Sequence, residues 1–301
     1  MSIRRALASL LLATLPLMGC TDREDGLNPI GGNGGDIVRQ ERFIKRLHLD
    51  LTGEIPDAAE SSAAVARLGE GAGPAARGAM ADELLADPRF ATLFVLNLEG
   101  RVFGGGTTED AYAMFCPDIP EIDPACADCA PSEDCRGCSC PTLASAFKER
   151  EGQMAAAADL AGGRATTGDI ERRYGASQVF TFSAESDEAA ASSLFAVFLG
   201  RPAEPDEVKN AAAMIQGTLA SGSPAGLLFH RLGESYADLV DILFTSEVYR
   251  EAAVDRVFLH YLGRNATPEE RSHFVAGLDP GSPDVRPVIR AVVSSGEYFA
   301  Q

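Results

Sequence analysis

The sequence lacks most of the residues and motifs on which common activities depend. It has no Trp and only four His residues, which are scattered along the chain. It contains no Gly-x-Ser-x-Gly elbow, phosphate-binding loop, His-Glu-x-x-His pair or calcium loop, and no Cys-x-x-Cys-His segment that would attach a c-type haem. Ser235, in Gly-Glu-Ser-Tyr, follows no predicted strand and is only a partial elbow. The sequence therefore predicts no catalytic residue and no cofactor, and it favours a protein that is not an enzyme.

Positive charge is also scarce. The 301 residues include 26 Lys and Arg against 44 Asp and Glu, which gives a formal net charge of −18. Such a surface repels phosphate backbones, so nucleic acid is excluded as a partner. With 46% hydrophobic residues the composition is that of an ordinary globular protein, and the length fits two domains or one large domain with an insert.

The first twenty residues predict export and a lipid anchor. Arg4 and Arg5 precede an apolar segment, residues 6–17, that is too short to cross a bilayer as a helix. The following Leu17-Met-Gly-Cys20 resembles the lipobox of bacterial lipoproteins. This resemblance implies a signal peptide of residues 1–19 and acylation of Cys20, for example with palmitate. A plain secretory signal is the alternative.

The residues after Cys20 predict how the protein is held. Residues 20–36 are polar and rich in glycine, so we expect a flexible tether. Thr21 occupies the position at which Asp retains such lipoproteins at the inner membrane, so the resemblance implies the outer membrane. The expected partners are the membrane, through the lipid, and other envelope proteins.

Residues 37–106 predict a helical module. Apolar residues recur at helical spacing from Ile37 to Leu51, and Gly53 ends this helix. Asp57 and Glu60 have the spacing of a capping box at the start of the next helix.

Two polar residues of the first predicted helix need an explanation. Asp50 lies near the helix C-terminus, where the helix dipole disfavours a carboxylate, so we expect it to bind Arg46 or a backbone N–H group. His48 lies between apolar positions, and we expect it to be a partly buried packing residue.

A resemblance to a known family covers part of this module. The segment Arg42–Pro56, which reads RFIKRLHLDLTGEIP, and the later Leu84–Phe90 resemble domain-of-unknown-function family 1549. Members of that family are exported bacterial proteins, often found beside cytochrome c-like domains. The resemblance implies a helical exported domain without an established reaction, so no catalytic residue is carried over.

Residues 107–145 form a cysteine-rich insert with almost no apolar side chains. An even number of Cys residues in an exported protein predicts disulfide bonds, here three, whose connectivity the spacing does not fix. Zinc, an iron–sulfur cluster or redox-active disulfides are the alternatives, and the zinc ligands would be the two Cys-x-x-Cys pairs, Cys126/Cys129 and Cys135/Cys138. The six residues are Cys116, Cys126, Cys129, Cys135, Cys138 and Cys140.

One phrase recurs in the second half of the chain. Leu194–Arg201 and Val257–Arg264 each read as the end of an amphipathic helix followed by Gly and Arg. We expect Gly200 and Gly263 to adopt the left-handed conformation that ends a helix. We expect Arg201 and Arg264 to bind helix carbonyls or the Glu of the next cap.

Both copies continue in the same way. Pro205–Glu207 and Thr267–Glu270 predict the next helix start, and both copies close on an apolar helix with a Ser, Glu and Tyr at its end. The first of these copies has about 14 additional residues around Ser221–Tyr236. A third, divergent copy begins at Leu47–Gly53 and has Asp87–Phe90 at the matching place.

The repeated phrase resembles domain-of-unknown-function family 4214 and the linker domains of phycobilisomes, which are small helical modules. The resemblance implies helix packing and protein–protein contact. Between the modules, residues 146–190 predict connecting helices, one of them capped within Thr167–Glu171, and a single strand-like run, Gln178–Phe182.

These observations predict an all-α protein of two or three divergent modules with a disulfide-bonded insert. The expected units are residues 37–106, 107–145, 146–190 and 191–301. The favoured function is that of a structural or adaptor lipoprotein that binds other envelope proteins. An accessory subunit of an envelope redox or hydrolytic system and a metal-binding protein centred on the Cys residues are the alternatives.

Overall fold

The computed structural model describes residues 34–69, 72–115, 143–177, 184–217 and 226–301, and these are predominantly helical. The prediction of a helical protein is confirmed. The lipobox with Cys20, the six Cys residues of the insert and the strand-like run 178–182 lie outside the described residues. Among the helices that are described, none is long and apolar enough to cross a membrane.

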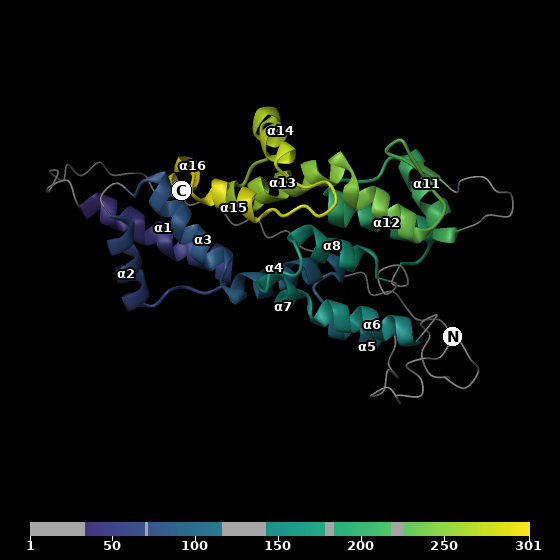
Figure 1. Ribbon diagram of the computed structural model, residues 1–301, viewed down its shortest axis with the longest axis horizontal. Helices are drawn as coiled ribbons and strands as arrows, with labels where there is room; N and C mark the ends of the chain where they lie inside the picture. The colour runs from purple at the N-terminus through teal and green to yellow at the C-terminus, as the bar shows by residue number, and fades with distance from the viewer. Residues whose placement is uncertain (1–33, 70–71, 116–142, 178–183, 218–225) are drawn as a thin grey trace, which may run out of the picture.

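Four helices form the first part of the chain (Figure 1). The helix α1 buries Phe43, Ile44, Leu47 and Leu51 at helical spacing, which explains why this segment folds as an amphipathic helix. The bounds are α1 (Gly34–Thr52), α2 (Ala58–Leu68), α3 (Pro74–Leu85) and α4 (Pro88–Val102).

Four further helices follow among the described residues. The cap of α8 is Thr166 and not a residue of Thr167–Glu171, because the Thr167 hydroxyl is engaged by the distant backbone N–H of Val285 at 2.9 Å. Thr166 and Asp169 form the capping box instead. The bounds are α5 (Thr108–Phe115), α6 (Leu143–Met154), α7 (Ala156–Ala161) and α8 (Thr167–Gly175).

The described residues from 184 to 301 are mostly helical and include one hairpin. The π-helical segment η2 continues α10 directly, so the two form one rod. The bounds are α10 (Asp187–Leu194), η2 (Phe195–Leu199), α11 (Pro205–Gln216), β1 (Gly226–Leu228), β2 (Arg231–Gly233), α12 (Tyr236–Thr245), α13 (Glu247–Leu262), α14 (Pro268–Ala276), α15 (Arg286–Val293) and α16 (Gly296–Ala300).

The hairpin β1–β2 was not predicted. Its strands pair antiparallel around a turn of Phe229 and His230, which have φ values of 48° and 63°. These values are unusual for residues other than Gly. A turn of Phe and His also lacks the Asn-Gly kind of signal that predicts a hairpin. The hairpin lies among the additional residues of the copy that begins at Leu194. A Cβ atom at Gly226 would lie 2.3 Å from the carbonyl oxygen of Asn210, so this Gly lets the hairpin approach α11.

The same local geometry occurs at three helix ends. Gly53, Gly200 and Gly263 have φ values of 74°, 64° and 69°, as the left-handed helix stop requires. Four residues later in each case stands the N-cap residue of the next helix, Asp57, Glu204 or Thr267. A Glu three residues beyond the cap accepts a hydrogen bond from its backbone N–H.

The first and last parts of the chain pack against each other. Arg77 of α3 donates to the carbonyl oxygen of Ser294 at 2.8 Å, and Arg290 of α15 binds Asp82 of α3 at 2.6 Å. The ring of Phe43 in α1 lies 5.9 Å from that of Tyr298 in α16. One continuous apolar core includes residues from Phe43 to Tyr298, so these helices form a single packed body in Figure 1.

Candidate functional site

A cavity of about 460 Å³ lies where α4 faces α13. Its volume is within the range of about 300–1,000 Å³ that is usual for ligand pockets. Helices from the first, middle and last parts of the chain contribute to its wall. The lining residues are Asp50, Phe90, Leu93, Phe94, Asn97, Arg101, Thr167, Glu171, Tyr249, Ala253, Arg256, Val257, Leu259, His260, Tyr261, Val285 and Ile289.

Most of this wall is apolar. From α4 come Phe90, Leu93 and Phe94, whose i, i+3 and i+4 spacing places them on one face. From α13 come Val257 and Tyr261, four residues apart. An apolar wall of this kind favours the binding of an apolar group.

Glu171 of α8 lines the cavity and is the centre of a buried polar cluster. One carboxylate oxygen accepts a hydrogen bond from Arg101 of α4 at 2.9 Å. The other accepts from Tyr249 at 2.7 Å and from Arg256 at 2.6 Å, both on α13. Glu171 therefore joins α4, α8 and α13, and its side chain is only 6% exposed. Sequence reasoning did not identify this residue.

The two Arg residues of this cluster also bind the π-helical segment η2. Arg101 donates to the carbonyl oxygen of Val197 at 3.2 Å, and Arg256 donates to that of Phe198. Carbonyl groups at the end of a helix lack partners within the helix and need external donors. The two guanidinium groups supply these donors, so each guanidinium binds both Glu171 and a carbonyl group of η2.

The charges of this cluster stabilise one another. Burial raises the pKa of the Glu171 carboxyl, but the charges of Arg256 and Arg101 and the hydrogen bond from Tyr249 outweigh burial, so its pKa lies below the usual value. Burial and the negative charge of Glu171 raise the pKa of Tyr249 well above its usual value. Glu171 is therefore ionised and Tyr249 neutral near neutral pH.

Asp50 of α1 also lines the cavity and has similar partners. Its carboxylate accepts a hydrogen bond from the Tyr298 hydroxyl at 2.8 Å and binds Arg46 at 3.3 Å, one of the two partners that the sequence predicted. Arg46 also donates to the carbonyl oxygen of Tyr261 at 2.7 Å. Burial and the charge of Asp50 raise the pKa of Tyr298. His48 is half-buried, as expected.

Tyr249 and Tyr298 occupy matching places in the repeated sequence. Each backbone N–H group donates to a capping Ser three residues earlier, Ser246 or Ser295. The apolar run Leu239–Tyr249 is thus not one helix: α12 ends at Thr245, and the Ser cap begins α13. Phe90 stands three residues after the cap Asp87 and has no hydroxyl to donate.

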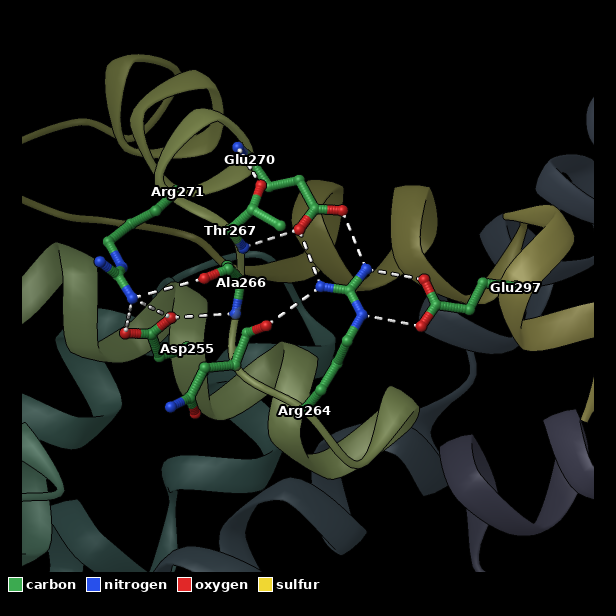
Figure 2. A network of polar contacts seen from close by, with 8 residues as sticks. Asp255, Arg264, Ala266, Thr267, Glu270, Arg271 and Glu297 are labelled. Carbon is green, nitrogen blue, oxygen red and sulfur yellow. Dashed lines mark hydrogen bonds and ion pairs between the residues drawn. The ribbon is translucent and has the colours of Figure 1, made fainter.

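The two repeated Arg residues bind the Glu of the following cap. Arg201 donates to both oxygens of Glu207 at 2.7 Å. Arg264 donates to Glu270 at 2.8 and 3.0 Å and to Glu297 at 2.7 Å, as Figure 2 shows. Each guanidinium lies 5.2 Å from the ring of a Phe in the helix that precedes it, Phe195 for Arg201 and Phe258 for Arg264. These contacts are bidentate and join groups within this chain, which is typical of a structural role.

The copy that begins at Leu47 carries the ion pair of Arg264 and Glu297 with its charges exchanged. Glu54 follows Gly53 as Arg264 follows Gly263, and it binds Arg89 at 2.7 Å. Arg89 precedes Phe90 as Glu297 precedes Tyr298. An acid thus occupies the position of Arg264, and a base occupies the position of Glu297.

Ser235 is not a nucleophile elbow. A strand, β2, does precede it, contrary to the sequence-based expectation, but Ser235 is the N-cap of α12 with a φ of −144°. Its hydroxyl bonds to Asp238, at 2.9 Å from one carboxylate oxygen. In the part of the chain that the structure describes, no group of His, Cys, Asp and Glu is arranged to hold a metal ion.

The four Asp, Glu and Arg residues that line the cavity, Asp50, Arg101, Glu171 and Arg256, each bind another residue of this chain. No protein-family model matches the chain, and searches of curated proteins and of solved structures also returned no match.

Proposed function

We propose that this chain is a lipid-anchored adaptor of a bacterial envelope, which binds an apolar segment of another envelope protein in the cavity between α4 and α13. One observation carries the proposal: most of the wall is apolar, and its four Asp, Glu and Arg residues are each bound to another residue of this chain. An apolar wall favours the binding of an apolar group.

The repeated geometry supports the same proposal. The three left-handed glycines, each followed by a cap four residues later, support three divergent copies of one helical module. The resemblances to families 1549 and 4214 favour an exported helical protein that contacts other proteins.

Blocking the cavity tests the adaptor function. Leu93→Trp places a larger ring in the wall, whereas Leu96→Trp on the same helix alters a side chain that is 52% exposed and lies outside the wall. Both variants, and the wild type, are expressed as the full chain and captured with crosslinked envelope proteins. We expect a partner that Leu96→Trp retains and Leu93→Trp loses.

Two results would contradict this function. Identical sets of captured proteins from both variants would show that the cavity does not bind a partner. Substrate turnover by the purified wild type that Leu93→Trp abolishes would make the cavity a catalytic site. Urea unfolding of both variants checks that each is folded.

The anchor and the insert have separate tests. Mass spectrometry of the protein taken from membranes should find Cys20 as the first residue with acyl chains attached, and a chain with an unmodified Cys20 would contradict lipidation. Thiol counting under denaturing conditions should find no free thiol among residues 116–140. Six free thiols with bound zinc would replace the disulfide proposal by the metal one.

A further inference from the structure

The outward face of α1 combines apolar and basic side chains. Val38, Arg42, Lys45 and Leu49 follow one another at intervals of four, three and four residues, so they form one stripe along the helix. Val38 is 57% and Leu49 47% exposed. Ile55, which is 66% exposed, extends the stripe beyond the end of the helix. We call these five residues the α1 stripe.

The stripe has a charge opposite to that of the protein. The groove along it is lined by Arg42, Lys45 and Arg46 against a single acid, Glu41, whereas the whole chain carries −18. Within the described residues neither Arg42 nor Lys45 forms an ion pair. Opposite the stripe, Phe43, Ile44 and Leu47 are buried in the core, so the helix cannot turn to hide its outward face.

We propose that the α1 stripe binds the surface of a membrane that contains anionic phospholipids. Basic side chains are attracted to anionic headgroups, and apolar side chains beside them enter the boundary between headgroups and acyl chains. From Val38 to Leu49 the stripe is about 16 Å long at 1.5 Å per residue. It begins 18 residues after Cys20 in the sequence.

The acidic remainder of the protein gives this contact an orientation. Anionic headgroups repel an acidic surface, so the protein binds with α1 toward the membrane and the other faces away from it. Lipidation is not required for this contact, so its test uses the chain with Cys20→Ala.

Vesicle binding tests the proposal. The purified full-length chain with Cys20→Ala is sedimented with vesicles of phosphatidylcholine, alone or mixed with phosphatidylglycerol. We expect binding to the mixed vesicles that weakens as salt is added. Arg42→Glu/Lys45→Glu should weaken it at least about tenfold, since each basic residue near such a surface contributes about fivefold. Val38→Ser/Leu49→Ser should weaken it in high salt as well.

A matched control separates the stripe from net charge. Lys148→Glu/Lys209→Glu makes the same charge change at exposed positions on α6 and α11, and it should leave binding within about twofold of the starting protein. Equal losses in both double variants, or no binding of the starting protein to mixed vesicles, would overturn the proposal. A starting protein that is dimeric in solution and becomes monomeric with Arg42→Glu/Lys45→Glu would assign the stripe to a second copy instead.

Discussion

Glu171 and Asp50 have similar hydrogen-bond partners, but the two carboxylates differ in their exposure to solvent. Each carboxylate accepts a hydrogen bond from a Tyr three residues after a Ser cap and from an Arg. Glu171 is 6% exposed and binds a second Arg, whereas Asp50 is 24% exposed and binds one. The buried version joins helices from three parts of the chain. The open version faces water that can replace its partners, so the same groups contribute less stability there.

The largest expected effect is the loss of the buried carboxylate. Glu171→Ala leaves Arg101 and Arg256 close together without a counter-charge, which should lower the free energy of unfolding by about 3–5 kcal/mol. Asp50→Ala should cost about 1 kcal/mol, because Asp50 is more exposed than Glu171 and Arg46 keeps the Tyr261 carbonyl. Urea unfolding of the full chain measures both. Equal losses of stability would show that burial does not make the Glu171 cluster more important than the Asp50 cluster.

Removing the two hydroxyls is a finer test of the same contrast. Tyr249→Phe deletes a hydrogen bond to a buried carboxylate and should cost about 1.5–3 kcal/mol, whereas Tyr298→Phe should cost about 1 kcal/mol. Neither change opens a cavity, because the rings are retained. The double-mutant cycle of Tyr249→Phe with Glu171→Ala should show strong coupling. Equal losses in the free energy of unfolding for the two Tyr changes would show that solvent exposure does not determine how much each hydroxyl contributes.

An exposed pair should give the smallest effect, visible through pH. The hydrogen bond from Arg264 lowers the pKa of Glu270 to about 2. Because the folded-state pKa lies below the unfolded value of about 4.3, the contribution is complete above that value and is lost as pH falls toward about 2. Both partners are 34% exposed, so we expect only about 1 kcal/mol.

The Glu270→Gln variant provides the control for this pH effect. Its free energy of unfolding should fall less steeply than that of the wild type between about pH 4.3 and about pH 2. Parallel curves for the two proteins would show that Glu270 does not contribute to acid sensitivity.

Local features of this fold could be predicted from the sequence. Apolar residues at helical spacing define α1, and Asp57 and Glu60 define the start of α2, because both signals lie within one or two turns of the chain. The hairpin could not be predicted, because its turn places Phe229 and His230 at positive φ, where tertiary contacts override local preference.

The cavity and its buried cluster could be predicted only in part. Asp50 and its partner Arg46 are one helical turn apart, and the sequence linked them. Glu171 binds Arg101 and Arg256, which lie 70 and 85 residues away, and no local pattern marks such a group. A signal was present in Tyr249, because a Tyr after a Ser cap recurs as Tyr298, and a repeated buried hydroxyl needs an acceptor.

The helix α13 belongs to two repeats, as the last helix of one and the first of the next. Its 16 residues hold Tyr249 and Arg256 toward Glu171 and then end at Gly263 and Arg264. An α-helix advances 1.5 Å and turns by about 100° with each residue. One residue inserted after Arg256 would leave the Glu171 cluster intact and rotate everything beyond it out of phase, including Tyr298. The length of this helix therefore sets the rotational phase between the Glu171 cluster and Tyr298, the partner of Asp50.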